Sequence, residues 1–169
     1  KTGTPVRVWR GTIDFDALTE QHGDSDPRPF SRFTTDTPLP QVSCWTGRTT
    51  VDTREVVRRN IERSPLYDGT IQGVSARYCP SFEDKVMMFP DNPTHQIIVE
   101  PEGLDTEEYY VSGTGNSLPY DIQVAMLHSI PGFERAEIMR PAYAIEYDVV
   151  DPTQLRPTLE AKQLPGLYF

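Results

Sequence analysis

Hydrophobic and polar residues alternate along this chain in short stretches, which favours many brief elements over a few long ones. A run rich in β-branched residues predicts a strand at 95–100, and further strands are expected at 41–46, 109–111, 137–140 and 143–150. Consecutive strands with few crossover helices are typical of antiparallel pairing. The pattern therefore predicts an α+β fold with a mixed, largely antiparallel sheet and flanking helices.

Helical periodicity is strongest where charged and apolar residues separate onto two faces. We predict a short helix at 14–22, closed by Gly23, a clear one at 52–63, a third at 81–89 and an amphipathic one at 119–130. The proline-rich stretch 24–40 has no periodicity and is expected to be an irregular loop.

Residues 52–63 carry the most basic face of the chain. With Asp52 as the expected N-cap, this helix places Val56 and Val57 on one side and the charged residues on the other. A face of this kind is more often a solvated, ion-paired surface than an RNA-binding one, and the sequence leaves both interpretations open. Contact with RNA or with a partner protein would use its four arginines: Arg54, Arg58, Arg59 and Arg63.

The 169 residues carry a formal net charge of −9, and this charge is unevenly distributed. Residues 1–63 have ten basic and nine acidic side chains, whereas residues 64–169 have six and sixteen. An acidic surface repels phosphate, so any nucleic-acid contact is expected in the first third of the chain. The chain has two cysteines and no apolar run near the roughly 20 residues of a membrane span, which predicts a cytoplasmic protein with free thiols.

Reactive chemistry is concentrated in the stretch 77–85. Pro80 has the fixed φ of a first helical residue, which would make Cys79 the N-cap; alternatively, Ser81 is the N-cap and Asp84 completes a capping box. In either case Cys79 lies near the positive end of a helix dipole and beside an arginine, and both favour the thiolate form of a nucleophile. The other interpretation is a buried cysteine beside a well-capped helix. The sequence has no dinucleotide-binding GxGxxG, no Walker loop and no metal-ligand spacing.

Several motifs of the chain, in the same order, resemble those of a known family. They are Lys1-Thr2-Gly3-Thr4-Pro5, Thr12-Ile13-Asp14-Phe15, Gln21-His22-Gly23-Asp24, Arg77-Tyr78-Cys79-Pro80-Ser81 with Glu83-Asp84-Lys85, His95-Gln96 leading to Glu100-Pro101-Glu102-Gly103-Leu104, Ser117-Leu118-Pro119, Arg140-Pro141 followed by Tyr143-Ala144-Ile145-Glu146-Tyr147-Asp148, and Pro157-Thr158-Leu159-Glu160. Together they resemble the tRNA uridine 5-carboxymethylaminomethyl modification enzymes, the MnmG or GidA family. The resemblance covers nearly the whole chain but only a middle section of the family's length.

The resemblance implies an internal fragment of a flavoprotein, because the family's glycine-rich FAD loop has no counterpart here. This region would be inserted into a Rossmann-type FAD-binding domain, with residues 1–12 as a connection, 13–135 as the insertion domain and 136–169 as strands returning to the FAD-binding domain. Family members form homodimers and act with a GTPase partner. They use FAD, NADH and a folate-borne one-carbon unit to modify carbon five of the wobble uridine in tRNA, and the fragment alone is expected to be inactive.

Within the family, the stretch corresponding to 75–89 is associated with nicotinamide nucleotide binding, and Cys79 corresponds to a candidate catalytic residue. The implied segment consists of Ser75, Ala76, Arg77, Tyr78, Cys79, Pro80, Ser81, Phe82, Glu83, Asp84, Lys85, Val86, Met87, Met88 and Phe89. Departures from the family pattern at Ser75-Ala76 and Phe82 leave its charged and nucleophilic groups in place.

Two other functions stay open: a non-catalytic module that binds tRNA or a partner protein, and part of a folate- and FAD-dependent tRNA uracil methyltransferase.

Overall fold

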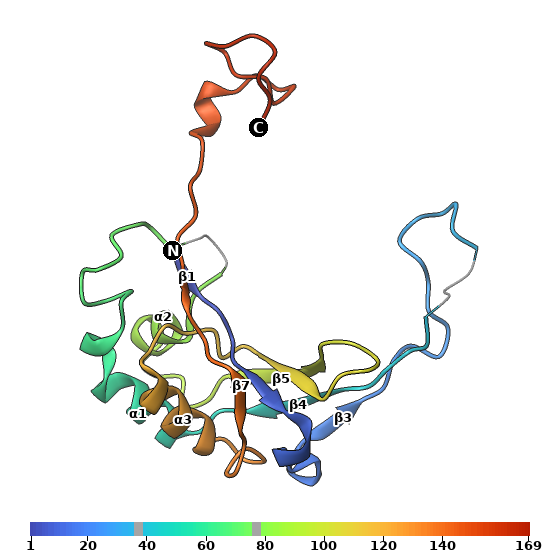
Figure 1. Cartoon of the computed structure of the whole chain (residues 1–169), viewed down its shortest axis with the longest axis vertical. Coiled ribbons are helices and arrows are strands. Elements are labelled where there is room, and N and C mark those ends of the chain that lie inside the picture. The colour runs from blue at the N-terminus through green and yellow to red at the C-terminus, as the bar shows by residue number, and fades with distance from the viewer. Residues whose placement is uncertain (36–38, 76–78) are drawn as a thin grey trace.

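The computed structural model describes residues 1–35, 39–75 and 79–169. Six short strands form one antiparallel sheet in the order β3-β4-β5-β6-β2-β7 (Figure 1). Their bounds are β2 Arg7–Trp9, β3 Thr19–Gln21, β4 Cys44–Arg48, β5 Gln96–Pro101, β6 Glu108–Ser112 and β7 Ile138–Arg140. Two further strands, β1 (Thr2–Gly3) and β8 (Ala144–Ile145), pair with each other and so bring distant parts of the chain together.

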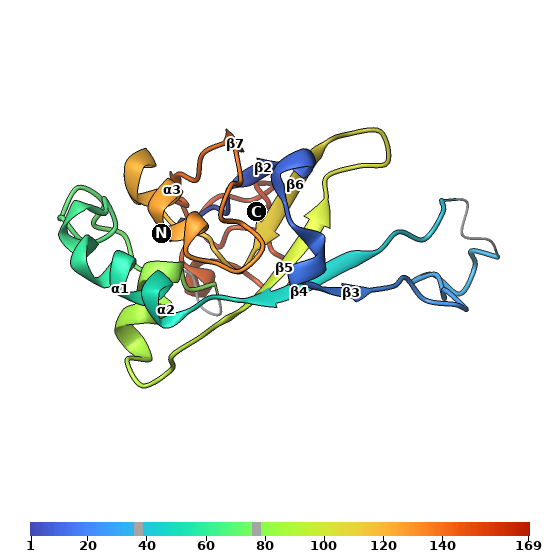
Figure 2. The same ribbon diagram turned by 90° about the horizontal axis from the view of Figure 1, so that it is seen from below.

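Three α-helices gather at one end of the sheet (Figure 2). They are α1 (Val51–Arg59), α2 (Phe82–Met88) and α3 (Tyr120–His128), and single 3₁₀ turns occur at Arg10–Thr12, Phe15–Ala17, Ile61–Arg63 and Pro152–Gln154. Leu127, Ile130 and Phe133, from the end of α3 and the loop after it, pack against the buried face of the sheet. A second cluster around Phe82 and Met126 joins the helices to one another.

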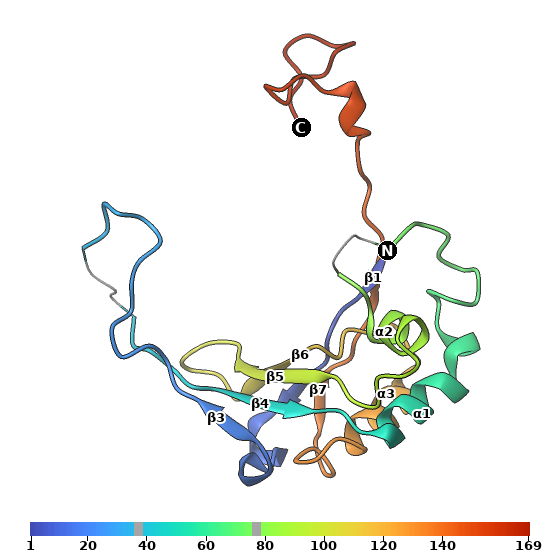
Figure 3. The same cartoon turned by 180° about the vertical axis from the view of Figure 1, so that it is seen from behind.

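Two segments lead away from this body in different directions (Figure 3). Strands β3 and β4 continue into a long arm, residues 22–43, whose described residues form neither helix nor strand and are mostly exposed. Residues 149–169 extend beyond the β1–β8 pair and fold back on themselves through the bridges Leu155–Ala161 and Glu160–Tyr168.

The predicted α+β class with a largely antiparallel sheet is confirmed. The helix predicted at 14–22 is wrong, because Asp14 caps a single 3₁₀ turn and Thr19–Gln21 then pairs with β4. Phe15, in this turn, and Leu18, which follows it, pack against the main core. A strand was expected at 143–150, but only Ala144 and Ile145 form one, β8, which pairs with β1.

The helix expected at 52–63 is capped two residues earlier than expected, and α1 ends at Arg59, with Ile61–Arg63 forming a separate 3₁₀ turn. Its N-cap is Thr50 and not Asp52: the Thr50 hydroxyl accepts the Thr53 N–H at 3.1 Å, and the Thr53 hydroxyl accepts the Thr50 N–H at 3.0 Å. Asp52 lies in the first turn, where its negative charge complements the helix dipole.

Strands β2 and β7 lie outside the expected insertion domain of residues 13–135, yet both belong to the same sheet as β3 to β6. The expected boundaries at 12 and 135 stay a prediction, and the sheet itself runs continuously across them.

Candidate functional site around Cys79 and Lys85

The start of α2 decides between the two capping alternatives. Ser81 is the N-cap: its hydroxyl accepts the Asp84 N–H, and the Asp84 carboxylate accepts the Ser81 N–H, both at 3.1 Å. Cys79 therefore precedes the helix and does not cap it. The N–H of Phe82 donates to the Gly115 carbonyl, so the amides at this helix start are largely used within the chain.

Both carboxylates of the helix serve the fold. Glu83 is fully buried, and its Oε1 accepts hydrogen bonds from the Ser117 N–H at 2.8 Å and from the hydroxyls of Ser64 and Ser117 at 3.0 Å. Asp84 accepts a hydrogen bond from the Tyr67 hydroxyl at 2.8 Å and one from the Ser75 hydroxyl at 3.3 Å. These bonds tie three loops to α2, which is how a short helix fixes the surroundings of Cys79.

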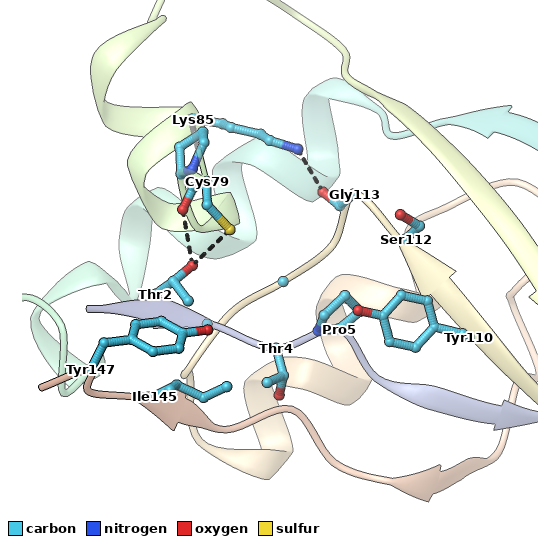
Figure 4. Close-up of a pocket in the computed structure, with 13 residues that line it drawn as sticks. Thr2, Thr4, Pro5, Cys79, Lys85, Tyr110, Ser112, Gly113, Ile145 and Tyr147 are labelled. Carbon is cyan, nitrogen blue, oxygen red and sulfur yellow. Dashed lines mark hydrogen bonds between the residues drawn. The ribbon is translucent and has the colours of Figure 1, made fainter. Parts of the chain in front are cut away.

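Cys79 and Lys85 line one side of a cavity of about 440 Å³ between α2, β1 and the outer face of β6 (Figure 4). The Thr2 hydroxyl donates to the Cys79 carbonyl at 3.0 Å and lies 3.7 Å from Cys79 Sγ. Lys85 Nζ donates to the Gly113 carbonyl at 3.0 Å. The remaining lining comes from small, hydroxyl-bearing and aromatic residues: Gly3, Thr4, Pro5, Pro80, Tyr110, Ser112, Gly115, Ile145 and Tyr147.

Lys85 is the only charged side chain among the described residues that line this cavity. Burial lowers the pKa of Lys85, and the negative charge that Cys79 can carry acts in the opposite direction. Burial also raises the pKa of Tyr110, an effect that the nearby Arg7 partly opposes. A cavity with one cation and no carboxylate, in a chain of net charge −9, favours an anionic ligand.

The other predicted nucleotide-binding residues are divided between the core and the surface. Phe82 and Val86 are buried among the helices, whereas Met87, Met88 and Phe89 are exposed at the end of α2. Ala76, Arg77 and Tyr78 lie outside the described residues. Of the predicted segment, the structure thus brings Cys79, Pro80 and Lys85 together around the cavity.

The arginines of the basic face differ in their surroundings. Arg54 donates to the Pro90 carbonyl at 2.8 Å, Arg58 pairs with Glu55 at 3.3 Å, and Arg63 forms two 3.1 Å hydrogen bonds with the Asp121 carboxylate. Arg59 is exposed and has no ion pair within residues 1–35, 39–75 and 79–169. The face is therefore largely an ion-paired surface, with Arg58 and Arg59 its most accessible cations.

Sequence reasoning missed the far side of the cavity. Thr2, Tyr110 and Tyr147 come from three separate parts of the chain. They meet because β1 pairs with β8 and because Thr4 bridges to Asn116 in the loop after β6. The one available signal is the alternation within β6, where Tyr109 is buried and Tyr110 points to the opposite face.

The antiparallel sheet with its cluster of short helices defines an α+β unit with a cavity at the sheet–helix junction. Comparison with known proteins identifies the family. The sequence profile described as "Glucose inhibited division protein A" matches residues 1–169, and the chain belongs to this family, known as GidA.

Two relatives and one solved structure match this chain along nearly all of its length. The tRNA uridine 5-carboxymethylaminomethyl modification enzyme MnmG of Syntrophobacter fumaroxidans is 67% identical over 169 residues, which are 100% of this chain and 26% of that protein. The enzyme of the same name from Thermodesulfovibrio yellowstonii is 56% identical over 169 residues, or 27% of its length. The structure of Aquifex aeolicus GidA in the form I crystal matches with a TM-score of 0.87 and 50% identity over 99% of this chain and 29% of that one. The chain thus spans about a quarter of the length of these relatives.

Proposed function

We propose that this chain is part of a flavin-dependent tRNA-modifying enzyme that acts on carbon five of the wobble uridine. The support is the resemblance to relatives named as tRNA uridine 5-carboxymethylaminomethyl modification enzymes along the whole chain. Under this proposal the complete cytoplasmic enzyme is a homodimer that works with a GTPase partner and uses FAD, NADH and a one-carbon folate. These relatives favour the proposal over a tRNA uracil methyltransferase.

The single observation that carries the role of this region is the cavity beside Cys79. Lys85, the one cation among the described lining residues, and the hydroxyl-bearing walls fit the phosphate and ribose of a nicotinamide nucleotide. When bound, NADH would supply the hydride that reduces the flavin. The chain's own residues would do three things: Lys85 would hold a phosphate, Tyr110 and Tyr147 would cover the ligand and exclude water, and Cys79 would present its thiol to the bound groups.

The role of Lys85 can be tested with the full-length enzyme. Lys85→Ala should raise the KM for NADH about ten- to a hundredfold, because a charge-assisted hydrogen bond contributes roughly 1.5–3 kcal/mol. Lys162→Ala is a matched control, since Lys162 lies in the 149–169 segment and donates to the Thr153 carbonyl far from the cavity. A lower melting temperature with unchanged NADH kinetics would make Lys85 a structural residue that only holds the Gly113 loop.

The role of Cys79 can be tested against the second thiol. Cys79 is exposed, whereas Cys44 lies partly buried in β4, where burial and the nearby Glu100 raise the pKa of its thiol. Iodoacetamide should therefore label Cys79 first at neutral pH. Cys79→Ser should abolish tRNA modification and Cys44→Ser should not; full activity of Cys79→Ser would end its assignment as a catalytic residue.

A second candidate function, a surface that binds tRNA or a partner protein without chemistry, is favoured by the exposure of Arg58 and Arg59. The two functions are compatible, because the arginine face of α1 and the Cys79 cavity share no lining residue.

In the described part of the chain no helix is long and apolar enough to cross a membrane.

A further inference from the structure

A second cavity, of about 420 Å³, opens on the other face of β6. Consecutive strand residues point to opposite faces of a sheet: Tyr110 lines the Cys79 cavity, and its neighbour Tyr109 lines this one. We call it the Trp45 cleft and define it by Arg10, Glu20, Trp45, Leu104, Glu107 and Tyr109. Its volume lies within the roughly 300–1,000 Å³ typical of small-molecule sites.

The floor of the Trp45 cleft is aromatic and rigid. The Trp45 ring lies 4.6 Å from that of Phe15 and 6.0 Å from that of Tyr109, measured between centroids. Tyr109 is 7% exposed and belongs to the main core, whereas Trp45 is only partly buried. The core thus holds the indole in place while part of its surface faces the cleft, as stacking of a flat ligand requires.

Charged groups of both signs surround this floor. Glu20 is directly opposite Trp45 in the β3–β4 register, so both side chains lie on the same face of the sheet, and Glu20 Oε1 is 3.3 Å from His22 Nδ1. The backbone N–H of Arg10 donates to the backbone carbonyl of Glu107 at 2.8 Å, so a residue with a guanidinium and a second residue with a carboxylate lie side by side at one rim. Within the described residues the side chains of Arg10 and Glu107 form no ion pair, and Arg10 instead lies 5.7 Å from the centroid of the Phe15 ring.

This combination of groups fits a heterocycle that offers both donors and acceptors. Carboxylates accept hydrogen bonds from amino and imino groups, and a guanidinium donates to carbonyl and ring-nitrogen acceptors. Guanine has the amino and imino donors on one edge and the O6 and N7 acceptors on the other. Uracil offers a single imino donor, and adenine has no carbonyl, so both match the two carboxylates and the arginine less well.

We propose that the Trp45 cleft binds an unstacked guanine base of the RNA substrate. This inference rests on the proposed function, because it names the part of the tRNA that this region recognises. Proteins read single-stranded RNA by stacking splayed bases on aromatic side chains. The arm begins at the cleft, since Val42 and Ser43 line it, and exposes Arg28 and Arg32 for contact with the neighbouring phosphates.

The first test uses the full-length protein and a fluorescently labelled tRNA whose binding is followed by anisotropy. The double variant Glu20→Ala/Glu107→Ala should weaken binding about five- to 150-fold, the loss expected when a specific base contact is removed. Removing acidic groups without such a contact should leave binding unchanged or tighten it, because RNA is an anion. Glu62→Ala/Glu137→Ala, which removes two exposed carboxylates outside the cleft, is the matched control.

The second test changes the RNA. Replacing guanosines of the anticodon arm by inosine, one at a time, removes only the exocyclic amino group. One replacement should weaken binding to the unaltered protein about fivefold or more and have no effect on the double variant, because the lost partner is then already absent.

The outcomes separate the two proposals. An unaltered protein that binds no tRNA overturns the proposed function and this inference with it. Binding that neither the double variant nor any inosine replacement changes overturns the inference alone. A loss in the double variant without an inosine effect also overturns it, because the carboxylates would then serve the fold or another ligand.

Discussion

Helices α1 and α2 both carry clusters of charged residues, but the surroundings of those residues are opposite. In α2, Glu83 is fully buried and Asp84 is 9% exposed, and each accepts hydrogen bonds from residues of other loops. In α1, Arg58 and Arg59 are exposed, and the Arg58–Glu55 ion pair stays within the helix. The carboxylates of α2 build the structure, whereas Arg58 and Arg59 of α1 remain accessible to a partner.

This difference shows that a motif rich in charge can specify backbone shape and ligand contact at once. Glu83 and Asp84 hold the loops that carry Ser64, Ser75 and Ser117. Of these three consecutive charged residues, only Lys85 lines the cavity. A substitution that disrupts the cluster could therefore abolish function through the fold alone, and the stability of each variant has to be measured beside its activity.

The largest effect is expected for Glu83. Glu83→Ala leaves two hydroxyls and the Ser117 N–H without their acceptor in a buried site, and should lower the free energy of unfolding by about 3 kcal/mol or more. Urea denaturation followed by circular dichroism measures this. Glu83→Gln keeps a carbonyl oxygen for these donors and should lose much less; equal losses would mean that charge, and not hydrogen bonding, matters here.

A smaller loss is expected for Asp84. Asp84→Ala removes half of the capping box and the acceptor of the Tyr67 hydroxyl, and should cost about 2 kcal/mol in unfolding free energy. Asp91→Ala is a suitable control because Asp91 is exposed beyond the end of α2. Losses of similar size in both variants would contradict a specific role of the cap.

The Tyr67–Asp84 hydrogen bond also predicts a dependence on pH. Burial, and then the hydrogen bond to Asp84, raise the pKa of Tyr67 above its usual value of about 10. The folded state holds the Tyr67 hydroxyl proton more tightly than the unfolded state. The contribution of this group to the free energy of unfolding is therefore complete below about pH 10 and is lost as the pH rises further. Tyr67→Phe should flatten the fall in stability above pH 10, as measured by urea midpoints from pH 8 to 11. An unchanged slope would exclude this linkage.

The smallest effect on folding is expected in α1. Arg58→Glu/Arg59→Glu should leave the melting temperature nearly unchanged, because exposed ion pairs contribute little. If α1 contacts tRNA, the same change in the full-length enzyme should weaken binding and reduce the salt dependence by about one unit of slope per lost phosphate contact. An unchanged salt dependence would mean that the arginine face of α1 is only a solvated surface, and the proposed difference in role between α1 and α2 would then be wrong.

Local patterns in the sequence account for much of the fold. The strand at 95–100, the helix at 119–130 and the Ser81–Asp84 capping alternative each depend on neighbouring residues, and each is found. Strand β2 was missed because three residues carry too little periodicity to predict a strand, although it lies between β6 and β7. The burial of Glu83 depends on Ser64 and Ser117, which no local pattern connects to it. The site residues Thr2, Tyr110 and Tyr147 could not be predicted for the same reason, because they meet only through tertiary contacts.

The pairing of Thr2 with Ile145 has a consequence for how this unit can be carried by a larger protein. The segment from Thr2 to Ile145 begins and ends at neighbouring positions, so a host would need only two adjacent surface positions to accept it. Segments with neighbouring ends are tolerated as insertions because the host's own strands need not move apart. An arrangement of this kind suits a segment that is lengthened, exchanged or removed at one place without disturbing the protein around it.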